Sequence, residues 1–308
     1  MTRSAEHVVS EYNDKDEVGM KIVSRIDDVR SAVMQARGEG KKIGFIPTMG
    51  YLHDGHLSLV EISRGITQFQ VMSIFVNRLQ FNDSSDFTNY PKDLERDIAM
   101  AGKCGVDLLF TPDDREMYKN ALTTVDVSRL TDNLCGAHRP GHFKGVFTVV
   151  SKLFNIVQPD LAVFGQKDIQ QAASIEKMVF DLNFPVRIIL APIIREKDGL
   201  AMSSRNKHLD QQQRADALAL SSGLKHAEQL ILGGERDVKK ITHEIESIIK
   251  KGNPDSIDYI SVVSYEDLSY IDRIDGKSVI ALAAFWGTTR LIDNMIIEVA
   301  GDSYKCIY

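Results

Sequence analysis

Two histidines, His53 and His56, lie three residues apart in the segment 47–56, PTMGYLHDGH. The apolar segment before it predicts a strand, and the segment after it has helical spacing. Imidazoles at such a turn can hydrogen-bond phosphate oxygens, stabilise a departing pyrophosphate or donate a proton. Gly50 and Gly55 permit tight turns, and the free N–H groups at a helix start suit phosphate. These residues favour a nucleotide site over two alternatives, a metal-binding pair and a simple helix cap.

Polar side chains follow the next predicted strand, residues 69–76. Asn77, Gln80 and Tyr90 come after this strand, so we expect them at the same edge of the sheet as the histidines. The amide of Gln80 can donate and accept at once, which suits a substrate that bears hydroxyls and a carboxylate. A polar loop without a ligand stays open as an alternative for Gln80 taken alone.

The segment 164–171, FGQKDIQQ, repeats the strand–turn–helix plan with a glycine at the bend. Gly165 allows the backbone to approach a ribose or phosphate, and Lys167 can reach phosphate oxygens as a point charge. Asp168 can accept from a ribose hydroxyl, and Gln171 follows on the same helical face. A structural alternative, in which Asp168 only caps the helix, explains the aspartate but not the lysine.

Hydroxyl groups and a guanidinium come together in the segment 202–205, MSSR. Ser203, Ser204 and Arg205 can clamp phosphate, because arginine binds oxyanions through several N–H groups. A turn followed by a helix cap at Asp210 is an equal alternative for this segment alone. Three further basic residues precede a predicted helix and fit a site or a solvated face equally well: Arg139, His142 and Lys144.

These motifs depend on an alternation of strands and helices along the first two thirds of the chain. Repeated β–α–β units imply a parallel sheet with helices on both faces and right-handed crossovers. We therefore predict an α/β fold with a Rossmann-like sheet. The predicted strands are 42–47, 69–76, 106–112, 160–165 and 186–192, and the predicted helices are 23–40, 56–65, 91–105, 144–158 and 168–182.

The pattern changes after about residue 193. Two amphipathic helices, 211–233 and 237–251, precede three predicted strands, and this grouping suggests a small α+β domain. The strands are 257–264, 278–285 and 291–299. We predict a flexible extension over 1–19, a nucleotide- and substrate-binding domain over 20–193 and a C-terminal α+β lid domain over 194–308.

Composition excludes several classes of protein. Of the 308 residues, 43% are hydrophobic and 26% charged, which suits a packed soluble core. The net charge of −6 argues against a large nucleic-acid-binding surface. The polar N-terminus lacks a signal-peptide pattern, and no run of about 18 apolar residues predicts a membrane span. The three cysteines, an odd number without CxxC spacing, favour reduced thiols in a cytoplasmic protein.

Several of these motifs together resemble one enzyme family. The segment 47–56 resembles the HxGH signature of the nucleotidylyltransferase superfamily, in the form found in pantothenate synthetases. The segment 75–81, FVNRLQF, resembles that family's FVNPxQF motif, and residues 139–171 resemble its long central block. Residues 202–205 resemble its counterpart of the KMSKS loop. The resemblance runs from about Lys41 to Asn294, with the motifs in the family's order.

The resemblance implies a two-step reaction in which pantoate is activated by ATP and then joined to β-alanine. Pantoyl adenylate and pyrophosphate form first, and the amine of β-alanine then displaces AMP to give pantothenate. The residue types fit this course, because the nucleophile is the substrate carboxylate and no serine or cysteine nucleophile is needed. A clamp on a separate lobe further implies hinge closure that excludes water.

The same resemblance implies roles for individual residues. The catalytic residues would be His53, His56, Lys167, Ser203, Ser204 and Arg205. Gln80 and Gln171 would bind pantoate, and Gln80 would also contact β-alanine. ATP would be bound by Met49, Gly50, His53, Gly55, His56, Gly165, Gln166, Lys167, Asp168, Ile194, Met202, Ser203, Ser204 and Arg205.

The chain departs from the family pattern in a few places. Arg78 stands where proline is usual, and Lys92 replaces a common arginine. Phe285 and Trp286 stand near a position that is basic in relatives, which we interpret as a matter of packing. Mg²⁺ is expected on the phosphates, its protein ligands remain unassigned, and the family implies a homodimer. Two rival interpretations stay open, a nucleotidylyltransferase that forms no amide and a non-catalytic ATP-binding protein.

Overall fold

A computed structural model of the chain describes residues 19–82, 84–300 and 303–308. The predicted extension over residues 1–19 therefore lies outside the described residues, apart from Gly19. The chain divides into two compact units. The first contains the described residues up to Val127, together with Arg139–Gly165 and Ile175–Ala191, and the second contains Ser128–His138, Gln166–Ser174 and Pro192–Tyr308.

The first unit contains a parallel sheet of six strands in the order β1-β4-β3-β2-β5-β6. Continuous apolar segments form these strands because both faces of the sheet are buried. The strands are β1 (Lys21–Val23), β2 (Ile43–Thr48), β3 (Phe69–Ile74), β4 (Leu108–Phe110), β5 (Leu161–Gly165) and β6 (Arg187–Ala191).

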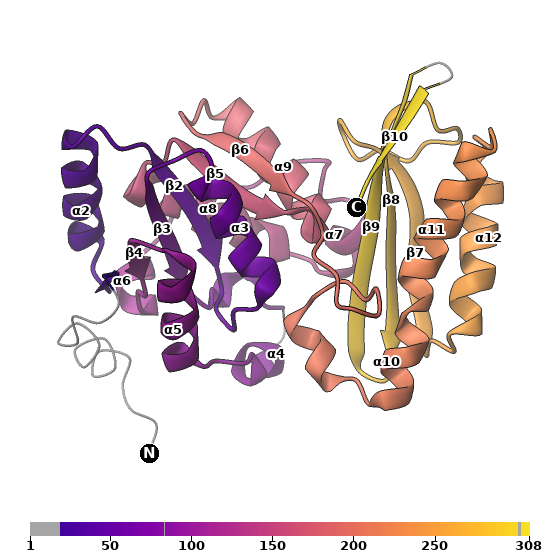
Figure 1. The fold of residues 1–308 in the computed structure, drawn as a ribbon, viewed down its shortest axis with the longest axis horizontal. Coiled ribbons are helices and arrows are strands. Elements are labelled where there is room, and N and C mark those ends of the chain that lie inside the picture. The colour runs from indigo at the N-terminus through magenta and orange to yellow at the C-terminus, as the bar shows by residue number, and fades with distance from the viewer. Residues whose placement is uncertain (1–18, 83, 301–302) are drawn as a thin grey trace. The chain divides into compact units, whose positions relative to one another are not determined.

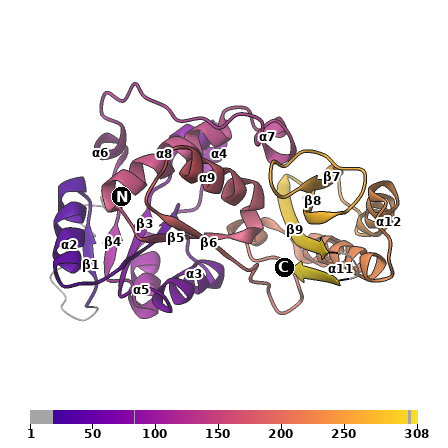
Figure 2. The same ribbon diagram turned by 90° about the horizontal axis from the view of Figure 1, so that it is seen from above.

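Helices cover both faces of this sheet. Figures 1 and 2 show α2 (Ile26–Gly38) and α8 (His142–Val157) on one face, and α3 (Asp54–Arg64) and α5 (Leu94–Cys104) on the other. The helix α9 (Ile169–Asp181) connects β5 to β6 after the short 3₁₀ helix η2 (Gln166–Asp168). Short elements also occur in the loops: η1 (Arg78–Gln80), α4 (Ser84–Asn89), α6 (Asp114–Tyr118) and α7 (Leu134–His138).

Two of the predicted helices begin later in the structure than predicted. The helix predicted from Val23 begins at Ile26, because Lys21–Val23 instead extends the sheet beside β4. Pro91 is not in the first turn of α5, because the side chain of Asp93 accepts from the backbone N–H of Arg96 and caps the helix at Leu94.

The strand order creates a switch point beside β2. Its neighbours are β3 on one side and β5 on the other, so the chain leaves β2 and β5 in opposite directions. In open parallel sheets, ligands bind outside the carboxyl ends of the strands at such a point. The segment after β2 carries the two histidines, and the segment after β5 carries Lys167.

The second unit packs helices against an antiparallel sheet of four strands in the order β10-β9-β8-β7. An apolar face of the sheet and the buried faces of the helices form one core around Trp286, Ile245 and Leu224. The strands are β7 (Ser256–Ser264), β8 (Gly276–Trp286), β9 (Thr289–Ala300) and β10 (Ser303–Ile307), and the helices are η3 (Ser204–His208), α10 (Gln211–Ala217), α11 (Ala219–Leu232) and α12 (Val238–Lys251).

The helix predicted over 211–233 is divided in two at Leu218. The end of α12 packs closely there, since a Cβ on Gly252 would lie 2.7 Å from the Cβ of Ala219 and would also collide with the carbonyl of Asp216. The indole N–H of Trp286 donates to the Gly252 carbonyl at 2.7 Å, which fixes that approach. The break between α10 and α11 thus coincides with a tertiary contact to the end of α12, which the helical periodicity of the sequence does not reveal.

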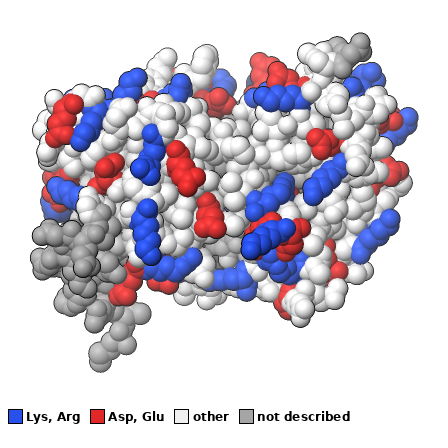
Figure 3. All heavy atoms as spheres, in the orientation of Figure 1, with Lys and Arg blue, Asp and Glu red and all other residues white. Residues whose placement is uncertain are grey.

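The surface carries charges of both signs. On the face drawn in Figure 3, lysine and arginine side chains are interspersed with aspartate and glutamate. Among the described residues, no helix has both the length and the apolar content needed to cross a membrane.

Candidate active site

The two histidines lie at the junction between β2 and α3. His53 is the N-cap residue of α3, and His56 lies in its first turn. The ring centroids are 4.0 Å apart, and the backbone N–H of His53 donates to Nδ1 of His56 at 3.3 Å. The structure thus brings together two imidazoles at the carboxyl edge of the sheet, as the spacing predicted.

A buried aspartate holds the loop that leads to these histidines. Asp97 on α5 is 1% exposed, and its carboxylate accepts from the backbone N–H groups of Tyr51 at 2.7 Å and Leu52 at 2.8 Å. Burial raises the pKa of Asp97, while the two N–H donors and Arg96 oppose this effect. Arg96 also donates to the carbonyl of Leu52 at 2.9 Å, so both the N–H and the carbonyl of Leu52 are hydrogen-bonded.

The close approach of the Asp97 side chain to this loop explains why residue 50 is a glycine. Gly50 has a φ of 84°, and a Cβ at this position would lie 2.9 Å from Oδ2 of Asp97 and 2.9 Å from a methyl group of Ile74. The neighbouring Tyr51 also adopts a positive φ, 53°. The segment 49–52, which follows β2, therefore bends closely around the Asp97 carboxylate.

Gln80 is joined directly to the same loop. Its side chain is buried, and its Nε2 donates to the sulfur of Met49 at 3.1 Å. Nδ2 of Asn77 donates to Oε1 of Gln80 at 3.0 Å and to the carbonyl of Gly145 at 3.0 Å. The segments after β2 and β3 thus meet at the carboxyl edge, and Asn77 orients the amide of Gln80.

Tyr118 completes this hydrogen-bond network. Its hydroxyl donates to Oδ1 of Asn77 at 2.8 Å. Burial, and secondarily Asp114, raises the pKa of Tyr118, so the phenol stays protonated and remains a donor at neutral pH. The sequence pattern did not reveal Tyr118, because it lies in a short polar helix far along the chain from Gln80.

Helix α8 supports Gln80 from its other side. Nδ1 of His142 lies 2.6 Å from the carbonyl oxygen of Gln80, and an added Cβ on Gly145 would collide with the backbone of Leu79 and Gln80. Arg139 lies 3.3 Å from Nε2 of His142. The structure therefore places His142 against the backbone of the candidate site, in a supporting position.

In the second unit, two consecutive residues of β9 hold two of the predicted ATP-binding segments. The amide of Asn294 donates to the carbonyl oxygens of Gln166 at 2.9 Å and Lys167 at 3.0 Å. Asp293 accepts two hydrogen bonds from the guanidinium of Arg195, at 2.7 and 3.1 Å. The sequence signal for these contacts is the polar pair Asp293-Asn294 inside the otherwise apolar strand 291–299, for which we predict no role from the sequence.

The segment 194–205 forms a compact turn around Gly199. Met202 donates its backbone N–H to the carbonyl of Ile194 at 2.9 Å, which places these two predicted ATP-binding residues opposite each other. Ser203 caps η3 by accepting from the N–H of Arg205 at 3.3 Å. Ser203, Ser204 and Arg205 are all partly exposed. Asp210 caps α10, as the turn-and-cap alternative expected, and the hydroxyl of Ser203 is used as a second cap.

The predicted site residues consequently fall into two groups, one in each unit. Two neighbours in the second group form an ion pair, since the ammonium of Lys167 lies 4.0 Å from a carboxylate oxygen of Asp168. The first unit contains Met49, Gly50, His53, Gly55, His56, Gln80 and Gly165. The second unit contains Gln166, Lys167, Asp168, Gln171, Ile194, Met202, Ser203, Ser204 and Arg205.

The departures from the family pattern have structural partners. Arg78 donates through Nε to both carboxylate oxygens of Asp114, at 2.8 and 2.9 Å, and lies 5.8 Å from the ring centroid of Tyr118. The ammonium of Lys92 lies 5.2 Å from the ring centroid of Phe87. Trp286 is buried in the core of the second unit.

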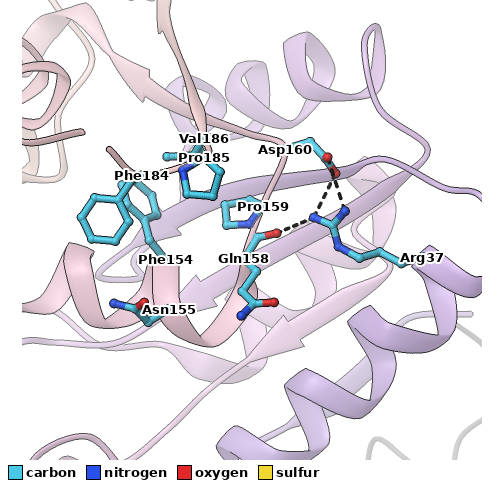
Figure 4. A pocket seen from close by; sticks show the side chains of 9 residues that line it. All are labelled: Arg37, Phe154, Asn155, Gln158, Pro159, Asp160, Phe184, Pro185 and Val186. Carbon is cyan, nitrogen blue, oxygen red and sulfur yellow. Dashed lines mark hydrogen bonds and ion pairs between the residues drawn. The ribbon is translucent and has the colours of Figure 1, made fainter. Parts of the chain in front are cut away.

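A pocket of about 410 Å³ lies elsewhere in the first unit, where β5 and β6 begin. Figure 4 shows Arg37 pointing toward Asp160 and the carbonyl of Gln158, with which it interacts. The pocket contains none of the predicted site residues, and its one cation is paired with Asp160. Its lining residues are Arg37, Phe154, Asn155, Gln158, Pro159, Asp160, Phe184, Pro185 and Val186.

Comparison with known proteins identifies the family of the chain. The family model described as pantoate-beta-alanine ligase matches residues 21–296. A pantothenate synthetase from Thermoanaerobacter sp. (strain X514) is 53% identical over 278 residues, which cover 90% of this chain and 98% of that protein. One from Desulfitobacterium hafniense (strain DSM 10664 / DCB-2) is 54% identical over 281 residues, covering 91% and 99%.

Solved structures of ligases from this family are also similar to this chain. The crystal structure of pantothenate synthetase from Thermus thermophilus has a TM-score of 0.84 at 42% identity and covers 89% of this chain and 98% of that one. The ligase from Francisella tularensis, complexed with beta-gamma ATP and β-alanine, has a TM-score of 0.72 at 32% identity and covers 89% and 97%.

The chain belongs to the pantoate-beta-alanine ligase family. The predicted family and the predicted fold class, a Rossmann-like parallel sheet with a second α+β unit, are confirmed. The roles of single residues stay predictions.

Proposed function

We propose that this chain is a pantothenate synthetase that joins pantoate to β-alanine at the expense of ATP, with release of AMP and pyrophosphate. The observation that carries this function is the family membership over residues 21–296, together with the contact between Met49 and Gln80. That contact joins the predicted nucleotide loop to the predicted pantoate residue. A related ligase binds an ATP compound and β-alanine.

In the first step, a carboxylate oxygen of pantoate attacks the α-phosphorus of ATP. A bond forms between that oxygen and phosphorus, and the bond from phosphorus to the bridging oxygen of pyrophosphate breaks. In the second step, the amine of β-alanine attacks the acyl carbon, loses a proton and displaces AMP. The protein contributes positioning and charge stabilisation, because the substrates supply both nucleophiles.

His53 and His56 stabilise or protonate the departing pyrophosphate. Their rings lie together at the start of α3, where the helix dipole favours negative charge. Lys167, Ser203, Ser204 and Arg205 of the second unit balance the charge of the same triphosphate in this proposal. The binding of ATP further involves Met49, Gly50, Gly55, Gly165, Gln166, Asp168, Ile194 and Met202.

Gln80 and Gln171 orient pantoate. The amide of Gln80 is held by Asn77 and Met49, which supports a fixed orientation toward a substrate with hydroxyl and carboxylate groups. Gln171 lies in the first turn of α9, just after Lys167 and Asp168. Its role follows from the family resemblance.

Mg²⁺ enters the proposal bound to the phosphates of ATP. Two acidic residues near the histidine loop, Asp93 and Asp97, have other partners, since both oxygens of Asp97 accept backbone N–H groups and Asp93 caps α5. Among the residues that the structure describes, no group of three metal-ligating side chains was found. We therefore assign no protein ligand to the metal and no reaction step to it.

We further propose that the chain is cytoplasmic and forms a homodimer, with functional lobes at 20–193 and 194–308. Free thiols at Cys104, Cys135 and Cys306 support a reducing compartment. The dimer follows from the family resemblance. Light scattering on the purified full chain measures its mass in solution, and a monomeric mass would contradict this part.

An exchange assay tests the reaction. With pantoate present and β-alanine absent, the protein should exchange labelled pyrophosphate into ATP, and addition of β-alanine should give pantothenate and AMP in equal amounts. Exchange that does not need pantoate, or release of a nucleotidyl conjugate without an amide, would favour a nucleotidylyltransferase. Absence of both activities would favour a non-catalytic ATP-binding protein.

A further inference from the structure

The strand β10 lies beyond the part of the chain that the family model matches. That match ends at residue 296, whereas β10 spans Ser303–Ile307 and pairs antiparallel with β9. The curated relatives are covered over 98% and 99% of their lengths by about nine tenths of this chain. The C-terminal segment 303–308 therefore lies outside the part of the chain that the family model matches.

The end of this added segment contacts the segment that follows β5. Nε2 of Gln166 donates to the carbonyl oxygen of Ile307 at 2.8 Å, and the Gln166 side chain is 1% exposed. Its other neighbour is Asn294, whose Oδ1 lies 3.4 Å from the same nitrogen. Ile307 thus supplies the shorter of the two hydrogen bonds that fix a predicted ATP-binding side chain.

The next residue contacts the second predicted ATP-binding segment. The backbone oxygen of Tyr308 accepts from the N–H of Ile193 at 3.1 Å, and its ring centroid lies 5.7 Å from the guanidinium of Arg195. Its hydroxyl donates to Glu228 on α11 at 2.6 Å. Ile194, a predicted ATP-binding residue, lies between the two residues that Tyr308 contacts.

We propose that Ile307 and Tyr308 are positioning residues for ATP, acting through Gln166 and through the segment 193–195. This inference rests on the proposed function, because it takes these two segments as parts of the nucleotide site. All the contacts lie within the second unit. The segment fixes both before ATP arrives, and a site ordered in advance binds more tightly because less conformational freedom is lost on binding.

The proposal predicts an effect on the binding of ATP and not on the binding of pantoate. Without Tyr308, the 193–195 segment loses a hydrogen bond and a cation–π neighbour, so ATP must order it on binding. Pantoate is bound in the proposal by Gln80 of the first unit and Gln171 of the second. The contacts of Ile307 and Tyr308 described above go instead to Gln166, the segment 193–195 and Glu228. The KM for ATP should therefore rise while the KM for pantoate stays nearly constant.

The experiment compares four variants with the wild-type chain by steady-state kinetics, with ATP and pantoate varied separately. Removal of residues 303–308 should raise the KM for ATP by about thirtyfold, because two hydrogen bonds to backbone oxygens, worth roughly 1 kcal/mol each, are lost. Tyr308→Ala should raise it by about fivefold, because the ring that contacts the guanidinium of Arg195 is lost while the backbone oxygen remains. Tyr308→Phe keeps the ring and the backbone oxygen and should recover most of the affinity. Tyr304→Ala, at a 44% exposed position of the same strand, is the matched control and should behave like the wild type.

Two outcomes would overturn the inference. One is an unchanged KM for ATP in Tyr308→Ala; the other is a parallel loss toward ATP and pantoate, which would indicate a role in folding alone. If the truncated chain does not fold, Tyr308→Ala decides by itself. Failure of the proposed function is distinguishable, because the wild type would then show no pantoate-dependent exchange at all.

Discussion

The carboxylate of Asp97 on α5 accepts a hydrogen bond from the backbone N–H of Leu52, 2.8 Å away, one residue before His53. Its second oxygen accepts from Tyr51. The position of the histidines at the carboxyl edge of β2 therefore depends on a residue of a different helix. The loop that carries the two predicted catalytic histidines therefore has a support that lies outside its own motif.

Asp97→Asn should weaken both the fold and the activity. An amide offers one acceptor oxygen in place of two, so one buried N–H group of the loop would face an NH₂ group. We expect a loss of about 2 kcal/mol in the free energy of unfolding, the cost of an unsatisfied buried donor. Urea unfolding and pantoate-dependent exchange measure the two effects.

The matched control is Asp93→Asn on the same helix. Asparagine caps a helix about as well as aspartate, so this variant should keep nearly all its stability and activity. If both variants behaved alike, the support that we assign to Asp97 would be wrong.

His56→Ala should abolish adenylate formation and leave the fold intact. The change removes one long hydrogen bond, from the N–H of His53 to Nδ1 of His56, whose loss should cost about 1 kcal/mol of stability. Exchange of pyrophosphate into ATP measures the first step alone. The exposed His243 on α12 provides the control, and His243→Ala should retain full exchange. Near-normal turnover of His56→Ala would contradict the catalytic role.

Gln80→Ala should raise the KM for pantoate strongly and change the KM for ATP little. The buried amide is oriented by Asn77, and its removal should cost about 2 kcal/mol of binding, roughly a thirtyfold rise in KM. Steady-state kinetics with pantoate varied at saturating ATP measure the effect. Gln35→Ala, at an exposed position of α2, is the control. Pantoate kinetics that match the control would count against this pocket.

Gly145→Ala should destabilise the first unit because α8 has no room there for a side chain. The added methyl group would collide with the backbone of Leu79 and Gln80. Overpacking of this kind costs about 2 kcal/mol, and the displaced Gln80 should also weaken pantoate binding. Gly38→Ala, at the end of α2, meets no described atom within 4 Å and should keep wild-type stability. Thermal unfolding of the two variants makes the comparison.

The sequence allowed a candidate site to be predicted where the chemically active residues and the local structure share one segment. The motif 47–56 carries the strand end, the tight turn and both histidines, so its spacing alone indicated a nucleotide loop. The alternation of strands and helices likewise predicted the parallel sheet, because buried strands read as apolar segments.

The supporting residues could not be predicted because their partners are distant in the chain. Asp97, Tyr118 and Asn294 act through contacts with residues 45, 41 and 128 positions away. A single sequence records the residue but not its partner. One signal was present, since Asp97 occupies the apolar face of α5 next to Ile98, and a buried acid needs hydrogen-bond donors.

Cys306 on β10 provides a test of the environment around Tyr308. Burial, reinforced by the negative charge of Glu228, raises the pKa of Cys306 to about 11. A raised thiol pKa keeps the neutral form to higher pH, and the thiolate is the species that reacts with iodoacetamide. At pH 8 the thiolate fraction should be about a hundredfold smaller than for a thiol with an ordinary pKa of 9.0.

Alkylation of Cys306 in the native protein should therefore be slow at pH 8 and accelerate about tenfold for each pH unit up to about 11. Peptide mass spectrometry measures the rate, and the same cysteine in urea provides the reference. Glu228→Gln should speed the reaction, because the charge that disfavours the thiolate is lost. Rapid alkylation of the native wild type at pH 8 would show that β10 does not bury its side chain beside Glu228.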